Sequence, residues 1–130
     1  MKKINFVIAI ILLFTIFSCK NESREGITVV SIEEMQMLSA LDNVQLVDVR
    51  TPKEYNAGHL PNAQNIDFNS PTFEQDIKQL DKNKPIILYC QKGGRSAKCA
   101  DKMHEAGFKK IFDLKGGFSK WQFKTLDLKL

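Results

Sequence analysis

A cysteine at the end of an apolar segment carries the most specific chemical signal in this chain of 130 residues. Cys90 closes the run Pro85-Ile-Ile-Leu-Tyr-Cys90, and Gln91-Lys-Gly-Gly-Arg95 separates it from a helix expected to begin at Ser96. Two adjacent glycines allow a tight curl in which several backbone N–H groups point inward and bind an anion. The start of a helix adds unpaired N–H groups and the positive end of its dipole.

These features favour a thiolate over a thiol at Cys90. Lys92 and Arg95 are expected to add two positive charges, and such surroundings bring a cysteine pKa from about 8.5 into the range of ~3.5–7.5. We therefore expect an ionised nucleophile facing a cup for an anionic group. A buried cysteine before an ordinary glycine turn is the structural alternative, and the combination of cysteine, paired glycines, arginine and helix start argues against it. The expected cup is formed by Gln91, Lys92, Gly93, Gly94, Arg95 and Ser96.

The elements that must position this loop alternate between strands and helices. Apolar, β-rich runs predict five strands, at 27–30, 44–49, 63–68, 85–90 and 110–114. Capping residues and helical periodicity predict helices between them, at 31–41, 51–58, 70–80 and 96–106, with a last helix after Gly116-Gly117. This alternation predicts an α/β fold with a mainly parallel sheet covered on both faces. Ligands of such sheets bind beyond the carboxyl ends of the strands, where Cys90 lies.

The cysteine loop and four further motifs, in the same chain order, resemble the rhodanese-domain sulfurtransferases. The motifs are Leu46-Val-Asp-Val-Arg50, Glu54-Tyr55, Gly58-His-Leu-Pro-Asn-Ala63, Cys90-Gln-Lys-Gly-Gly-Arg-Ser96, and Leu114-Lys-Gly-Gly117 with Trp121. The resemblance covers residues 27–126 and implies a rhodanese-like, five-stranded, mainly parallel sheet flanked by helices on both faces. It also implies that Cys90 carries a sulfane sulfur as a persulfide, cradled by the backbone N–H groups of residues 91–96.

By this resemblance the chain is expected to be an enzyme similar to thiosulfate sulfurtransferases. It would move sulfane sulfur from thiosulfate or a persulfide donor to a thiol or cyanide, while Arg95 and the loop N–H groups hold the departing anion. A phosphatase or arsenate reductase is one alternative, but phosphatases of related fold have five residues between cysteine and arginine, whereas four separate Cys90 from Arg95. A binding or sulfur-relay module of rhodanese fold is the other, and the presence of Cys90 argues against an inert copy.

Four further polar residues are expected to be structural. Asp48 and Arg50 end the strand beneath the loop, where a paired carboxylate and guanidinium would support the site without catalysing the reaction. His59 follows a glycine at a helix end, and an ionised thiolate requires no base. Cys99 is a candidate resolving thiol, but it shares one apolar helix face with the residues four and seven positions later, which favours a place in the core.

The first 18 residues are expected to be an export signal rather than part of the domain. Lys2 and Lys3 precede a largely apolar stretch, 4–17, that would span about 21 Å as a helix and fall short of the ~30 Å hydrocarbon core. Its ending, Ile16-Phe-Ser-Cys19, resembles the lipobox of bacterial lipoproteins, which implies lipidation of Cys19. An ordinary secretory signal cleaved nearby, with Cys19 incidental, is the alternative.

Cleavage before Cys19 would leave the lipidated cysteine and a polar tether at 19–26, followed by the rhodanese-like domain at 27–130. The protein is then expected to be exported and held by its lipid in the cell envelope, facing the periplasm or on the outer membrane.

The composition excludes several other classes of protein. With 43% hydrophobic and 26% charged residues, the chain is neither disordered, collagen-like nor a multi-span membrane protein. Without Lys2 and Lys3, 17 basic residues face 15 acidic ones, and a net charge of +2 with no basic, aromatic-rich stripe argues against nucleic-acid binding. The three cysteines match no zinc spacing, so no metal and no cofactor are expected.

Overall fold

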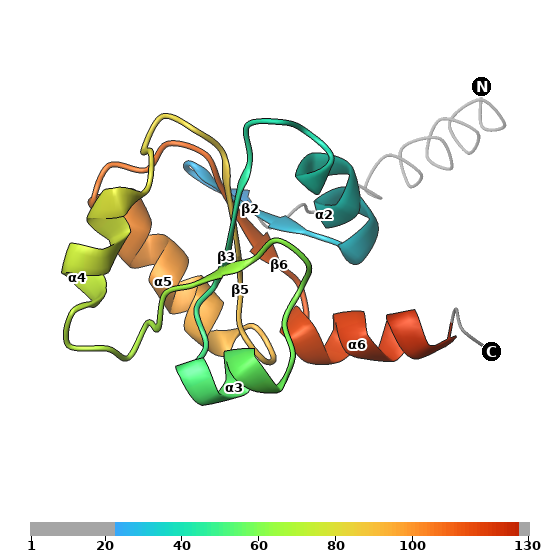
Figure 1. Cartoon of the computed structure of the whole chain (residues 1–130). Coiled ribbons are helices and arrows are strands. Elements are labelled where there is room, and N and C mark those ends of the chain that lie inside the picture. Colours follow the sequence, from blue (N-terminus) through green and yellow to red (C-terminus); the bar gives the residue numbers. More distant parts are fainter. Residues whose placement is uncertain (1–22, 128–130) are drawn as a thin grey trace, which may run out of the picture.

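A six-stranded sheet runs through the middle of the molecule, which the computed structural model describes over residues 23–127 (Figure 1). The strands are β1 (Ser23–Arg24), β2 (Ile27–Val30), β3 (Gln45–Asp48), β4 (Gln64–Asn65), β5 (Ile86–Tyr89) and β6 (Ile111–Leu114). Their order is β1-β2-β6-β5-β3-β4, and only the β1–β2 pair is antiparallel. The predicted α/β fold with a mainly parallel sheet is confirmed, with six strands where five were expected.

The sixth strand lies in the stretch that was expected to be a tether. Ser23 and Arg24 pair with Thr28 and Ile27 across a tight turn at Gly26, whose φ is 72°. The polar sequence around Arg24 has no β-rich run, so no strand signal stands out from it. The sheet therefore begins four residues earlier than the predicted domain boundary at 27, whereas Cys19 lies outside the described residues.

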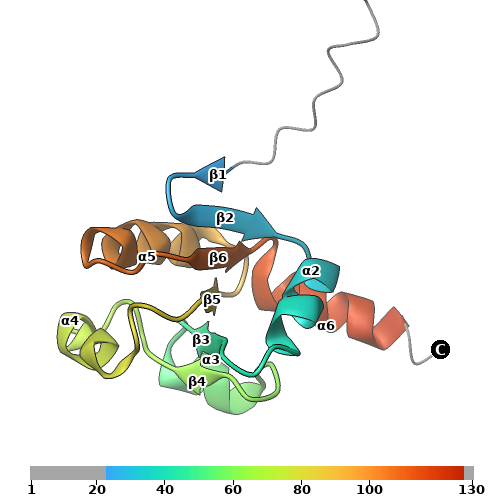
Figure 2. The same cartoon turned by 90° about the horizontal axis from the view of Figure 1, so that it is seen from above.

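Helices cover both faces of the sheet. They are α2 (Ile32–Ser39), α3 (Pro52–Ala57), α4 (Phe73–Asp76), the 3₁₀ turn η1 (Ile77–Gln79), α5 (Gly94–Glu105) and α6 (Gly117–Asp127). Figure 2 shows α4 and α5 on one side of the strands and α2 and α6 on the other. Both predicted capping boxes are present, at the starts of α2 and α3. Within residues 23–127, no helix has the length and apolar character needed to cross a membrane.

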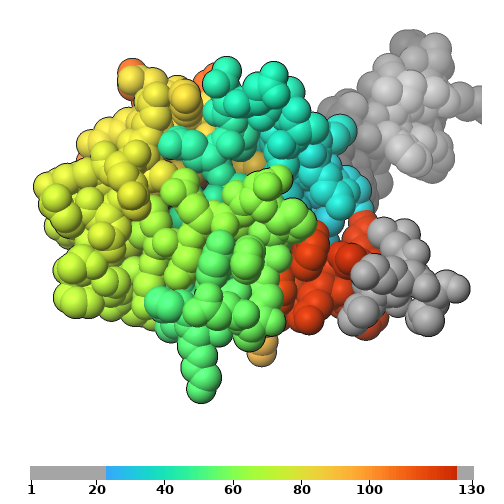
Figure 3. Space-filling view, viewed as in Figure 1, coloured from blue at the N-terminus to red at the C-terminus, as the bar shows by residue number. Residues whose placement is uncertain are grey.

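The central strand β5 is buried on both faces. Ile86 and Leu88 pack in the core beneath α4 and α5, whereas Ile87 and Tyr89 pack in the core beneath α2 and α6. A strand covered on both sides by helices can carry apolar residues without alternation, which explains the continuous apolar run before Cys90. In the space-filling view, the segments between α3 and β5, coloured green to yellow, cover much of the visible face (Figure 3).

Two predicted elements are shorter than the sequence pattern indicated. The strand expected at 63–68 is reduced to β4 at the sheet edge, although Ile66 and Phe68 still donate backbone N–H groups to the Asp48 and Val49 carbonyls at 3.0 and 3.1 Å. The helix expected at 70–80 is divided into α4 and η1. Ser70 accepts a hydrogen bond from the backbone N–H of Thr72 at 3.2 Å, and this local turn competes with a helix start.

Candidate active site

Cys90 directly follows β5 and lies in the turn that leads into α5. The residue is 1% exposed, and its Sγ accepts a hydrogen bond from the backbone N–H of Gly93 at 3.0 Å. Gly93 is the N-cap of α5 and has a φ of 112°, a conformation that favours glycine. The helix consequently begins at Gly94, two residues before the expected start at Ser96, so Arg95 and Ser96 belong to its first turn.

The loop lowers the pKa of the Cys90 thiol despite its burial. Burial is the largest influence and acts to raise the pKa, but hydrogen bonds from Ser96, Gly93 and Lys92 together outweigh it. Backbone N–H groups of all three residues contribute, and the Ser96 hydroxyl adds to them. The result is a cysteine whose thiolate is stabilised by amide dipoles, as expected for a nucleophile at a helix start.

The start of α6 holds the loop from its outer side. The backbone N–H of Phe118 donates to the Cys90 carbonyl at 2.8 Å, and that of Ser119 donates to the Gln91 carbonyl at 3.1 Å. A Cβ at Gly117 would lie 2.4 Å from the Cys90 carbonyl oxygen, and Gly117 has a φ of 61°, so a side chain does not fit there. The sequence predicted a helix after this glycine pair, but its contact with the cysteine loop joins segments far apart in the chain and was missed.

Arg95 forms an ion pair that the sequence did not predict. Its guanidinium donates to both carboxylate oxygens of Glu54, at 2.7 and 2.8 Å. Hydrogen bonding from Arg95 is the main cause that lowers the pKa of Glu54 from 4.5 to about 2. Arg95 therefore connects the first turn of α5 to α3. Its positive charge is paired with Glu54, whereas the sequence predicted that this charge would act on the cup. Lys92 is exposed and reaches the sulfur through its backbone N–H.

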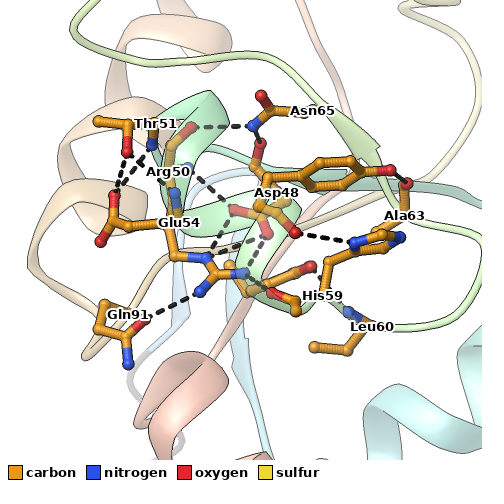
Figure 4. A network of polar contacts seen from close by, with 12 residues as sticks. Asp48, Arg50, Thr51, Glu54, His59, Leu60, Ala63, Asn65 and Gln91 are labelled. Atoms are coloured by element: carbon orange, nitrogen blue, oxygen red, sulfur yellow. Dashed lines mark hydrogen bonds and ion pairs between the residues drawn. The ribbon is translucent and has the colours of Figure 1, made fainter.

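Asp48 and Arg50 form a buried pair beneath the loop, in the supporting place expected for them (Figure 4). The Arg50 guanidinium donates to both Asp48 oxygens, with a shortest contact of 2.7 Å. It also donates to the Gly58 carbonyl at 2.6 Å and to the Gln91 side-chain oxygen at 2.9 Å. The Gln91 amide in turn donates to the Ser119 hydroxyl at 2.8 Å, so this side chain connects the loop to its supports.

Cys99 and His59 lie where structural residues were expected. Cys99 is fully buried in the core beside Met103, and burial raises the pKa of its thiol to about 12. His59 stacks on Tyr55 with ring centroids 3.8 Å apart, and its Nδ1 lies 2.9 Å from the Tyr55 carbonyl oxygen. These contacts give each residue a place in the packing of the fold.

Known proteins with similar sequences include enzymes. The chain is 32% identical over 91 residues to the thiosulfate sulfurtransferase GlpE of Shewanella oneidensis, which covers 70% of this chain and 88% of that protein. It is 39% identical over 103 residues to the tRNA uridine(34) hydroxylase of Buchnera aphidicola, where the match covers 75% of this chain but 32% of the relative.

A solved structure shares the fold. The crystal structure of a rhodanese-like domain protein from Staphylococcus aureus superposes with a TM-score of 0.64 at 30% identity, covering 72% of this chain and 89% of that one. Residues 31–124 match the family model of the rhodanese-like domain. The chain therefore belongs to the rhodanese-like domain family.

Proposed function

We propose that the chain is a sulfurtransferase that moves sulfane sulfur from thiosulfate or a persulfide donor to a thiol or cyanide through Cys90. The observation that carries this proposal is the Cys90 sulfur held at 3.0 Å from the Gly93 N–H, with its thiol pKa lowered by the loop amides. The similarity to GlpE, whose name describes a thiosulfate sulfurtransferase, supports thiosulfate as a donor.

The reaction proceeds in two displacements at the same sulfur. In the first, the Cys90 thiolate attacks the outer sulfur of thiosulfate, the donor S–S bond breaks, and sulfite leaves with the electron pair. Cys90 is then a persulfide anion. In the second, an acceptor thiol attacks the outer sulfur, Cys90 leaves as the thiolate, and the thiol proton ends on the transferred sulfur. The inward N–H groups and the α5 dipole stabilise the negative charge in both steps.

Mass spectrometry after incubation with thiosulfate tests this function. The protein should gain one sulfur atom, located on Cys90, and cyanide should remove it. Cys90→Ser should abolish both the adduct and turnover, because an alcohol near neutral pH is neither ionised nor able to form a persulfide. Cys99→Ala is the matched control and should retain both, since Cys99 is a core thiol with a raised pKa. Sulfur on Cys99, or full activity in Cys90→Ser, would refute the mechanism.

The choice of acceptor distinguishes this enzyme from a sulfur-relay module. A persulfide that forms on Cys90 but is discharged by neither cyanide nor any small thiol would favour transfer to a protein partner. Transfer of the Cys90 sulfur to cyanide or a small thiol would support the proposed sulfurtransferase activity.

We also propose that the protein is exported and anchored in the cell envelope by a lipid on Cys19. The basic start at Lys2 and Lys3, the apolar stretch at 4–17 and the sequence Ile16–Cys19 support this proposal.

A further inference from the structure

Asp113 on β6 is a buried carboxylate close to the cysteine loop. It is 6% exposed, and its Oδ1 is enclosed by protein with no hydrogen-bond partner among residues 23–127. In the sheet it pairs in register with Val29 of β2 and with Leu88 of β5, two positions before Cys90. β6 also packs against α5, as Figure 2 shows, and the carboxylate is within reach of Ser96 in the first turn of that helix.

The Ser96 hydroxyl connects this carboxylate to the nucleophile. Ser96 is fully buried, and its hydroxyl donates to the Gly93 carbonyl at 3.2 Å. Hydrogen bonding by the same hydroxyl acts to lower the pKa of Cys90 and that of Asp113. A serine hydroxyl has only one proton to donate. The thiolate, the carboxylate and the Gly93 carbonyl therefore compete for a single donor.

Burial is the largest influence on the charge of Asp113. It raises the pKa of Asp113 to about 6, while the Ser96 hydroxyl and the charge of Arg24 on β1 act to lower it and the charge of Asp101 on α5 adds to the rise. Arg24 donates to Asp101 at 2.7 Å, so these two charges offset each other at Asp113. The other titratable groups near it are the buried thiol of Cys99 and the exposed side chains of Lys92 and Lys115.

The protonation state of Asp113 changes what the Ser96 hydroxyl can do. An ionised carboxylate only accepts hydrogen bonds, and it draws the hydroxyl proton away from the sulfur. A neutral carboxyl group has a proton of its own to donate to the Ser96 oxygen, which leaves the hydroxyl free to donate to the Cys90 thiolate. Protonation of Asp113 therefore strengthens the hold of Ser96 on the thiolate.

We propose that Asp113 is a positioning residue for sulfur transfer, whose carboxyl group directs the Ser96 hydroxyl toward or away from Cys90 and so controls how strongly the thiolate is held. The inference rests on the proposed function, in which Cys90 is first the nucleophile and then the leaving group. In both roles the negative charge is on the Cys90 sulfur, whereas in the persulfide it is on the outer sulfur and the hydroxyl is released to Asp113. Asp113 acts through Ser96 and not on the substrate, since its Oδ1 is closed to solvent.

The pH dependence of Cys90 alkylation by iodoacetamide tests this in the full chain. Asp113→Asn keeps the shape of the side chain and removes its negative charge. We expect it to shift the midpoint of the alkylation profile to lower pH, because the hydroxyl is no longer drawn from the thiolate. Glu105→Gln is the matched control, since it removes an exposed carboxylate from the last residue of the same helix. It should leave the wild-type midpoint unchanged.

A double variant shows whether the effect passes through the hydroxyl. In Ser96→Ala, the further change Asp113→Asn should produce no shift of the alkylation midpoint, because the connecting group is gone. A shift of the same size with and without Ser96 would mean that the carboxylate acts on the sulfur directly through its charge. No shift in either background would mean that Asp113 has no influence on Cys90. Each of these results would overturn the inference.

The side-chain carboxyl carbon of Asp113 gives a second measurement that requires no substitution at this buried position. In the wild-type chain its ¹³C resonance should titrate with a midpoint near pH 6, and the midpoint should be higher in Ser96→Ala. An ordinary midpoint near pH 4, or an equal midpoint in the two proteins, would contradict the contact. Neither measurement uses a sulfur donor. A chain that shows these shifts but takes up no sulfur from thiosulfate would refute the sulfurtransferase and leave the control of the thiol by Asp113 in place.

Discussion

At the scale of single residues, amide groups and one hydroxyl lower the pKa of the Cys90 thiol, whereas the sequence predicted that the side-chain charges of Lys92 and Arg95 would add to the effect of the amides. Arg95 is bound to Glu54, and Lys92 contributes its backbone N–H to Cys90. Ser96 is fully buried, its hydroxyl donates to the Gly93 carbonyl at 3.2 Å, and it also lowers the pKa of the thiol. Ser96 thus stabilises both the geometry of the turn and the charge within it.

Removal of this hydroxyl should therefore raise the pKa of Cys90. In Ser96→Ala we expect the thiol pKa to rise, because the influence of the Ser96 hydroxyl on the thiolate is lost while the backbone donors remain. The measurement is the pH dependence of alkylation by iodoacetamide, with Ser119→Ala as a control at a hydroxyl that contacts Gln91 but not the sulfur. An unchanged profile in Ser96→Ala would show that the backbone donors alone set the thiol pKa.

The ion pair between Arg95 and Glu54 should appear in the pH dependence of stability. The pKa of Glu54 is lowered to about 2 in the folded protein from 4.5. The ionised Glu54 carboxylate therefore contributes fully to the free energy of unfolding above pH 4.5. This contribution is lost as the pH falls toward 2. In Glu54→Gln, the free energy of unfolding should fall less steeply over that interval, as measured by urea denaturation at a series of pH values. Parallel curves for the two proteins would mean that the carboxylate titrates normally.

The sequence predicted those parts of the site that depend on neighbours in the chain. Cys90, Gly93 and the start of α5 lie within five positions of one another, so cysteine, glycines and helix start could be interpreted together. Glu54 lies 41 residues from Arg95, and the pairing of their charges follows only from where the fold places α3 and α5.

At the scale of elements, the end of β5 and the start of α6 form one unit around the nucleophile. The first amides of α6 donate hydrogen bonds to the carbonyls of Cys90 and Gln91, so this helix start is bound to the loop.

The elements of the fold also differ in how far the sequence predicts them, because some depend on local signals and others on distant partners. The helices α2 and α3 were predicted from their own capping boxes, whereas β1 and β4 have two residues each and exist through pairing with a neighbouring strand.

The close approach of α6 to the loop makes Gly117 a sensitive position. Gly117→Ala should lower the free energy of unfolding by at least about 1 kcal/mol, because alanine resists a positive φ and its Cβ would overlap the Cys90 carbonyl. Gly94→Ala is the matched control: apart from its chain neighbours and the backbone of its own helix, no heavy atom lies within 4 Å of a Cβ built there. Its stability should be unchanged or higher by up to about 1 kcal/mol. Urea unfolding of both variants measures the difference, and equal stabilities would contradict the contact.

At the scale of the whole molecule, the first strand limits how far the domain can lie from its proposed anchor. Cys19 and Ser23 are four positions apart, and a fully extended chain spans at most about 3.6 Å per residue. A lipid on Cys19 would therefore hold the edge of the sheet within about 15 Å of the modified residue. The expected tether at 19–26 would have allowed roughly twice that distance.

Loss of this cysteine should release the protein while leaving its chemistry intact. In Cys19→Ala, we expect the chain to move from the membrane fraction to the soluble fraction or to remain unprocessed, because the acceptor of the lipid is gone. Sulfur loading by thiosulfate should be unchanged, since the cup is built from residues after β5. Cys90→Ser is the reciprocal control and should stay with the membrane while losing the adduct. A mature terminus at another residue, with no lipid mass on the protein, would contradict the anchor and favour an ordinary secretory signal.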